Sequence, residues 1–160
     1  MKKLKIYLDT SAIGYLDEQT SPKEMDDMQR LWKLIKQDVY DAAISQVVYD
    51  EITNNKNTEK ADILLSYLSE IDYEMVGITK EANKISDLVA SNGVLDEKHK
   101  NDRLHIGCAV ASNCDIIVSL NFKHLVNVKT IKGVRGIANL EGYSNIDIVP
   151  PTMLIQEGDN

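Results

Sequence analysis

The sequence lacks several features that would place it in a special class of protein. It has only two cysteines, Cys108 and Cys114, too few for a disulfide-rich scaffold and typical of a reduced, cytoplasmic interior. We expect both to be packing residues, because their spacing with His105 matches no common zinc pattern. No apolar run approaches the roughly 18 residues of a membrane span, so no membrane contact is expected. The first apolar run is broken by Asp9 and is too short for a signal peptide.

The sequence also lacks an overall excess of basic residues. Its net charge is −7, which argues against a general nucleic-acid coat but is compatible with a nuclease whose carboxylates lie in one pocket. Acidic residues are in turn missing from residues 116–140. The basic side chains of that segment either contact phosphate or form a solvated helix face balanced by acids from elsewhere. They are Lys123, Lys129, Lys132 and Arg135.

The order of the expected elements indicates the fold class. Short runs rich in β-branched and aliphatic residues alternate with segments of helical periodicity, which predicts a mostly parallel sheet with helices on both faces. A chain of 160 residues makes one domain the default, and we place it at residues 1–150, with a C-terminal tail at 151–160. The strand-like runs are residues 5–8, 40–44, 73–76, 115–119 and 146–149.

One helix start is marked clearly in the sequence. Ser21 would be the N-cap, Pro22 the first helical residue and Glu24 the reciprocal member of a capping box. The helix would run to about Gln37. Trp32 lies on its apolar stripe, and we expect it to be a core residue rather than a platform for substrate.

The first expected strand ends in an acid followed by two hydroxyl residues. Ile6-Tyr7-Leu8 is a continuous apolar run, typical of a strand buried on both faces. Asp9 follows it, at the place where open α/β sheets bind their ligands. Asp9 can equally serve as a simple helix N-cap, and Thr10 and Ser11 can cap the next helix through their hydroxyls.

A second carboxylate lies on the helix expected after the second strand. Glu51 falls three residues after Val48 and four after Val47, so it shares their inward-facing stripe. A carboxylate in such a position needs a partner, because an unpaired buried charge is costly. A salt bridge or a position at the rim of the core would satisfy Glu51 equally well.

A third carboxylate, Asp102, follows the polar segment 96–101. It lies in the first turn of a helix that is apolar nearly all round over residues 104–111, and the helix dipole stabilises a carboxylate there. Arg103 could pair with Asp102 or reach toward phosphate. His105 could face the same pocket as Asp102, although a packing role is the simpler expectation.

Asn121 is a fourth polar group of this kind, because it follows the strand expected at 115–119. Together with Asp9, Glu51 and Asp102 it suggests a polar cluster at the carboxyl edge of the sheet. Several carboxylates without cationic partners repel one another unless a divalent cation neutralises them. Oxygen ligands favour Mg²⁺ or Mn²⁺ over zinc.

Taken in chain order, these residues resemble the PIN domain family, and especially its VapC-like branch of toxin–antitoxin ribonucleases. The opening motif alone is short, but the ordered set extends over nearly the whole chain. The resemblance is carried by Tyr7-Leu8-Asp9-Thr10-Ser11-Ala12-Ile13, by Glu51, by Asn101-Asp102 with the helix from Leu104 to Ala111, and by the segment from Asp115 to Leu125.

The resemblance implies a three-layer α/β/α sandwich with a central, mostly parallel sheet, and metal-dependent endoribonuclease activity. Asp9, Glu51 and Asp102 match the three acidic positions of the family and would hold Mg²⁺ or Mn²⁺. RNA would be the substrate, and a toxin would have an antitoxin partner. Homodimers are common in the family, but no stripe of this sequence can be assigned to an interface. Thr10, Ser11 and Ser119 would bind the phosphate or the carboxylates, and Arg103, Lys123, Lys129, Lys132 and Arg135 would contact the RNA backbone.

The sequence departs from the family pattern at Asn121, where the family often has a fourth acid. Asparagine can offer a carbonyl oxygen or orient a metal-bound water, but it adds no negative charge. We therefore expect one firmly held ion rather than two. The departure also supports an alternative, a PIN-fold module that binds protein or RNA with weak or no catalysis.

Two other small α/β classes fit the sequence less well. A receiver domain of two-component signalling has paired acids after the first strand and its phosphorylated Asp after the third. Here the first strand offers only Asp9, and the third ends in Gly77. A haloacid-dehalogenase phosphatase needs an acid two residues after the first Asp, where this chain has Ser11.

Overall fold

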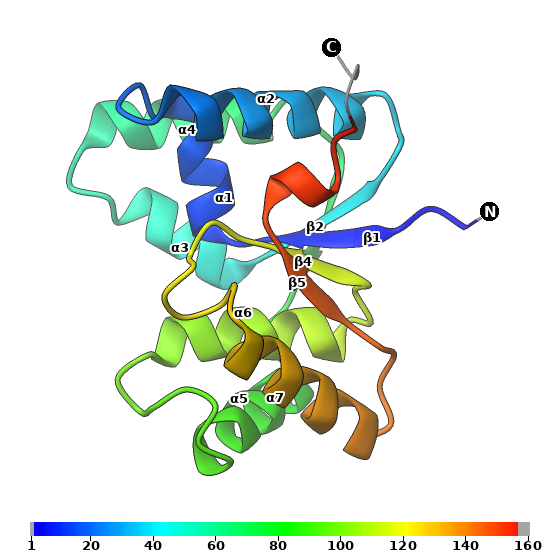
Figure 1. The fold of residues 1–160 in the computed structure, drawn as a ribbon. Coiled ribbons are helices and arrows are strands. Elements are labelled where there is room, and N and C mark those ends of the chain that lie inside the picture. Colours follow the sequence, from blue (N-terminus) through cyan, green and yellow to red (C-terminus); the bar gives the residue numbers. More distant parts are fainter. Residues whose placement is uncertain (1, 157–160) are drawn as a thin grey trace.

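A parallel sheet of five strands forms the centre of the structure, a computed structural model that describes residues 2–156 (Figure 1). The strands lie in the order β3-β2-β1-β4-β5, and every neighbouring pair is parallel. The predicted alternation of strands and helices is confirmed, and the sheet is parallel throughout. The strands are β1 (Lys5–Leu8), β2 (Asp41–Ser45), β3 (Tyr73–Val76), β4 (Ile116–Val118) and β5 (Asp147–Val149).

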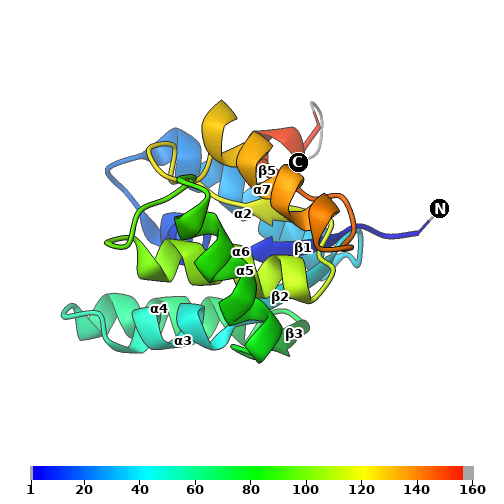
Figure 2. The same ribbon diagram turned by 90° about the horizontal axis from the view of Figure 1, so that it is seen from below.

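Helices cover both faces of the sheet, as predicted. They are α1 (Thr10–Gly14), α2 (Pro22–Lys36), α3 (Gln46–Thr53), α4 (Thr58–Leu68), α5 (Lys80–Ser91), α6 (Lys100–Ala111) and α7 (Val128–Leu140), with the 3-10 helices η1 (Tyr15–Asp17) and η2 (Pro151–Met153). In Figure 1, α1, α2 and α4 lie above the sheet, and α5, α6 and α7 lie below it. Figure 2, seen from below, shows α5 and α6 over the strands. The short helix α3 contacts α1, α4 and α6.

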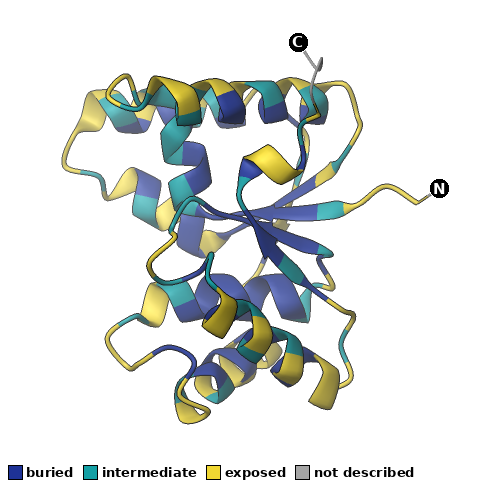
Figure 3. Ribbon diagram, viewed as in Figure 1, coloured by how far each residue is buried: buried dark blue, intermediate teal, exposed yellow. Residues whose placement is uncertain are grey.

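The central strand β1 determines where the polar edge of the sheet lies. Residues 6–8 are fully buried, and Figure 3 shows the strands as the most buried part of the molecule. β1 pairs with β2 on one side and with β4 on the other. Because Leu8 is in register with Val118, the residues that follow them, Asp9 and Ser119, are neighbours at the carboxyl edge.

Polar residues cap the starts of several helices. The side chains of Asp9, Ser45 and Thr79 accept a backbone N–H in the first turn of α1, α3 and α5, and each has a ψ near 170°. Ser21 does not: its ψ is 69° and its side chain makes no capping hydrogen bond. The capping box predicted for Ser21 and Glu24 is therefore wrong, although the helix does begin at Pro22.

The aromatic residue of α2 belongs to the core, as expected. Trp32 is 2% exposed, next to Leu31, which is fully buried. Its Nε1 donates a hydrogen bond to the carbonyl oxygen of Tyr67, 3.2 Å away, on α4. The ring therefore joins the two long helices of this layer and has no free face for a substrate.

The two helices α5 and α6 approach closely at Gly107. A Cβ at this position would overlap the backbone carbonyl of Ala82 on α5. Gly107 therefore permits a close contact that a larger residue would prevent. Asp102 lies in the first turn of α6, so this contact helps to fix the position of the helix that carries it.

The chain continues to pack on the sheet layers beyond residue 150. Pro151 and Leu154 are buried, and the Tyr40 hydroxyl donates to the carbonyl oxygen of Leu154 at 2.6 Å. The first residues assigned to the tail are thus packed, and residues 157–160 lie outside the described residues. Within residues 2–156, no helix combines the length and the apolar character that crossing a bilayer requires.

Candidate active site

Asp9 is the most buried carboxylate at the carboxyl edge of the sheet, with 2% of its surface exposed. The Ser119 hydroxyl donates to Asp9 Oδ2 at 2.6 Å, and the Ser11 hydroxyl donates to Oδ1 at 2.7 Å. The backbone N–H of Ala12 donates to the same Oδ1 at 2.9 Å. Asp9 is therefore a helix N-cap, and it is also a fixed acceptor at the predicted edge. Ser11 and Ser119 bind the carboxylate, one of the two roles expected for them.

The environment of Asp9 disfavours its charged form. Burial raises the pKa of Asp9, and the attraction of His105 and the hydrogen bond from Ser119 offset only part of this effect. A nearby cation would stabilise the ionised form of this buried acid.

Glu51 projects from α3 toward the same edge. The Thr10 hydroxyl donates to Glu51 Oε1 at 2.7 Å, and Nε2 of His105 lies 2.7 Å from the same oxygen. Burial raises the pKa of Glu51, but the hydrogen bond and charge of His105 and the hydrogen bond from Thr10 outweigh it, so the pKa is lowered. Thr10 follows Asp9 directly, and its bond to Glu51 links the two carboxylates through adjacent residues.

His105 belongs to this site and is not only a packing residue. It is 3% exposed, and its Nδ1 lies 2.7 Å from the Tyr7 hydroxyl. That hydroxyl is in turn 2.7 Å from the Ser45 hydroxyl. Burial raises the pKa of Tyr7 well above its ordinary value, so the hydroxyl keeps its proton. The result is a buried chain of hydrogen bonds from Ser45 through Tyr7 and His105 to Glu51.

Asp102 contacts His124, a residue for which no role is predicted from the sequence. Nδ1 of His124 lies 3.1 Å from Asp102 Oδ2. Asn121 holds the turn that presents this histidine, because its Oδ1 accepts the backbone N–H of His124 at 3.0 Å. The carbonyl oxygen that Asn121 would offer to a metal or its water is thus engaged in the turn.

The basic residues divide into two groups. Arg103 is 4% exposed and donates to the Ser86 carbonyl at 3.1 Å, so it is a buried contact to α5 rather than a surface group for phosphate. Arg135 is bonded to Asp147, at the amino end of β5. The exposed lysines of the segment are Lys123 before α7 and Lys129 and Lys132 on it.

The donor set has the chemistry of a Mg²⁺ or Mn²⁺ site. Asp9, Glu51 and Asp102 offer hard oxygen ligands, and within residues 2–156 none of them is paired with lysine or arginine. Their present contacts do not complete a metal site, since no three His, Cys, Asp or Glu side chains of the described residues are placed to share an ion. Glu51 and Asp102 would have to turn away from their histidines. Their side chains are 32% and 22% exposed, so they are not locked inside the core.

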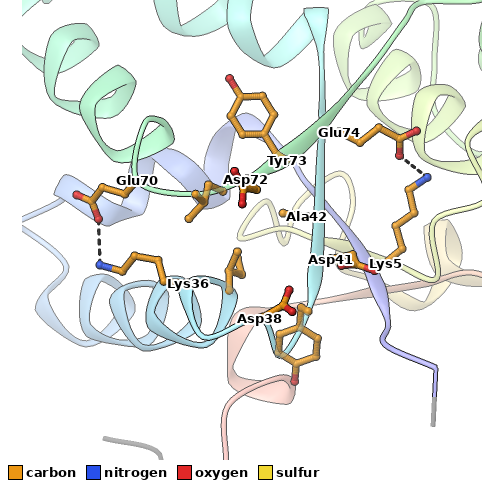
Figure 4. A pocket seen from close by; sticks show the side chains of 12 residues that line it. Lys5, Lys36, Asp38, Asp41, Ala42, Glu70, Asp72, Tyr73 and Glu74 are labelled. Carbon is orange, nitrogen blue, oxygen red and sulfur yellow. Dashed lines mark hydrogen bonds and ion pairs between the residues drawn. The ribbon is translucent and has the colours of Figure 1, made fainter.

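A hollow at the opposite, amino edge of the sheet has a different character. Its volume is about 570 Å³. Figure 4 shows two ion pairs in its wall, Lys36 with Glu70 and Lys5 with Glu74. Acids that already have lysine partners have little need of a metal ion, and we therefore place the candidate site at the carboxyl edge.

Sequence reasoning missed the role of three residues. His124 and the Tyr7–Ser45 pair join the site through contacts between elements far apart in the chain, and no local pattern indicates them. His105 did carry a signal, its position three residues after Asp102, but residues 103–110 of its helix are all buried and periodicity cannot assign it a face.

Comparison with known proteins supports the fold. No protein-family model matches the chain, and no curated protein matches it by sequence. The chain is similar to one in the crystal structure of VapBC2 from Rickettsia felis bound to a DNA fragment from their promoter, with a TM-score of 0.57 and 18% identity over 92% of this chain and 98% of that one. It also matches a chain of VapBC-5 from Mycobacterium tuberculosis, a member of the VapBC family of toxin–antitoxin systems, with a TM-score of 0.48 and 16% identity over 91% and 98% of the two chains. The Rickettsia felis structure confirms the predicted PIN-like fold.

Proposed function

We propose that this protein is a metal-dependent endoribonuclease that hydrolyses phosphodiester bonds of RNA. One observation carries the proposal. Three carboxylates, Asp9, Glu51 and Asp102, lie toward the carboxyl edge of a parallel sheet, and within residues 2–156 none has a lysine or arginine partner. Asp9 and Glu51 are linked through Thr10, whereas Asp102 contacts His124. A structural ion-pair network would have supplied such partners, as it does in the hollow at the amino edge.

The carboxylates would hold Mg²⁺ or Mn²⁺ once Glu51 and Asp102 turn toward Asp9. Such an ion, when bound, lowers the pKa of a coordinated water and stabilises the negative charge that develops on the phosphate. The raised pKa of Asp9 supports this assignment, because the nearby cation would favour the ionised form that burial disfavours.

The surrounding residues would position these carboxylates. Ser11 and Ser119 fix both oxygens of Asp9, so its orientation is set before any ligand arrives. The fixed orientation of Asp9 reduces the cost of arranging charged groups during the reaction. Glu51 is held by Thr10 and His105 in the metal-free protein and would give up its contact with His105 on binding a metal ion.

The proposed partners follow from the fold and the site. RNA would approach the carboxyl edge, where the exposed lysines Lys123, Lys129 and Lys132 lie on or before α7. The similar Rickettsia felis chain comes from a VapBC2 structure, and the sequence resembles the VapC-like toxins, so we propose a protein antitoxin as a partner of this chain. A homodimer and a cytoplasmic location stay predictions from the sequence.

A catalytically weak PIN-fold binding module is the second candidate. It is favoured by the contacts of Asp102 with His124 and of Asn121 with the backbone of the same histidine, which leave no three-ligand metal group among the described residues. In this case Glu51 would stay bound to His105 and Asp102 to His124, and the carboxylates would have only a structural role.

RNA cleavage by the purified protein in EDTA, Mg²⁺ or Mn²⁺ separates the two candidates, with thermal unfolding recorded in the same buffers. The nuclease predicts metal-dependent cleavage and a higher melting temperature with metal, because a ligand that binds only the folded state stabilises it. The binding module predicts neither effect.

A further inference from the structure

A second pocket lies beside the proposed carboxylate site. It is formed between the turn that precedes α6 and the segment that leads from β4 into α7, and its volume is about 550 Å³, within the range of small-molecule sites. We call it the imidazole pocket and define it by His99, His124, Lys123, Lys129, Val94 and Leu95.

The imidazole pocket begins where the carboxylate site ends. His124 lines the pocket, and its Nδ1 also contacts Oδ2 of Asp102 at 3.1 Å. A polymer whose phosphate reaches Asp102 would therefore have its neighbouring nucleotide at this pocket.

Two lysines of the pocket have no acidic partner among the described residues. Lys123 and Lys129 are exposed and form no ion pair within residues 2–156. The acids in the wall do have partners. Asp96 lies 2.6 Å from Nδ1 of His99, and Glu97 lies 3.6 Å from the Arg103 guanidinium. Two unpaired lysines at one rim are suited to a phosphate group.

The wall of the pocket also suits a base. The rings of His99 and His124 are 3.9 Å apart between centroids and tilted by 54°, so they form a small aromatic surface. Val94 and Leu95, each 8% exposed, add an apolar floor. Unstacked RNA bases bind to surfaces of this kind, including histidine rings.

We infer that the imidazole pocket holds one nucleotide of single-stranded RNA next to the bond that is cut, with its phosphate on Lys123 and Lys129 and its base against the two imidazole rings. The inference rests on the proposed ribonuclease function and adds to it a subsite for the substrate. It also explains why the histidine that contacts Asp102 lies at the end of a lysine-lined hollow.

The test is RNA binding without cleavage. Fluorescence anisotropy of a labelled single-stranded RNA of mixed sequence is measured in EDTA, with every variant made in an Asp9→Asn background. The double variant Lys123→Ala/Lys129→Ala is compared with Lys80→Ala, an exposed lysine on α5 outside the pocket. We expect the double variant to bind about tenfold more weakly and to lower the slope of log K against log salt by about 0.7 for each lysine removed. The control should bind like the parent.

A second variant tests the aromatic surface. In an Asp96→Asn background, which removes the carboxylate that His99 contacts, His99→Ala should weaken RNA binding by about fivefold or more while leaving the salt slope unchanged, because stacking is not a charge interaction. Equal binding by parent, double variant and His99→Ala would overturn the subsite. Cleavage by the wild-type protein is measured separately, so binding without cleavage would support the pocket and overturn the nuclease.

Discussion

The imidazole of His105 bridges a buried tyrosine and a carboxylate of the candidate site. Its Nδ1 lies 2.7 Å from the Tyr7 hydroxyl, and its Nε2 lies 2.7 Å from Glu51 Oε1. Because a carboxylate only accepts hydrogen bonds, Nε2 must carry a hydrogen. The core of the sheet thus fixes the orientation of a side chain at the functional edge.

Replacing His105 should therefore destabilise the fold. In His105→Ala the buried Tyr7 hydroxyl and Glu51 lose a partner and a cavity opens, and we expect the free energy of unfolding to fall by about 2–3 kcal/mol. His105→Gln, which can still donate to Glu51, should recover part of this loss. Urea unfolding measures both. His99→Ala, at a more exposed histidine, should cost less than about 1 kcal/mol, and an equal cost at both positions would contradict the bridging role.

Asp9 should make stability depend on pH in a predictable direction. Burial raises the pKa of Asp9, so the folded chain binds its proton more tightly than the unfolded chain. The stability contributed by protonated Asp9 is fully present below the unfolded pKa and is lost as pH rises through the folded value.

In the variant Asp9→Asn, residue 9 is uncharged at every pH, so its contribution to stability should not decrease as the pH rises. In EDTA, its free energy of unfolding relative to wild type should rise as the pH increases from about 4 to 7. Urea unfolding across this range measures the difference. A difference that stays constant, or that falls with pH, would show that burial does not control this carboxyl group.

Two glycines test the packing that supports Asp102. Gly107→Ala places a Cβ against the Ala82 carbonyl, so α6 must move from α5, and we expect a loss of about 1–3 kcal/mol in unfolding free energy. At Gly136, inside α7, an added Cβ meets nothing within 4 Å. Gly136→Ala should therefore gain about 0.5–1 kcal/mol from helix propensity. Similar effects at the two positions in urea unfolding would refute the close contact.

Much of the fold follows from local sequence signals. The apolar run at Ile116–Val118 and the run before Asp9 predict buried strands, and strands separated by helices predict a parallel sheet whose carboxyl edge collects polar groups. Asp9, Glu51 and Asp102 could be placed at that edge for this reason.

The contacts between elements could not be predicted in the same way. The residues of α6 are buried on nearly all sides, so the sequence does not show that Arg103 faces α5 while His105 faces Glu51. Arg135 lies six residues along α7 from Lys129, about 9 Å of helix, and its helix returns toward the amino edge. A shared run of basic residues therefore does not form one surface.

The most direct test of the central claim is RNA cleavage by the wild-type protein, Asp9→Asn and Asp87→Asn, each in Mg²⁺ and in EDTA. Asp87 is an exposed carboxylate on α5 and serves as the matched control. We predict cleavage by the wild type and by Asp87→Asn in Mg²⁺ alone. In Asp9→Asn the rate should fall about 100-fold or more, because a bound metal stabilises the transition state by several kcal/mol. Cleavage that persists in EDTA or in Asp9→Asn, or no cleavage by the wild type in Mg²⁺, would contradict a metal-dependent nuclease built on these carboxylates.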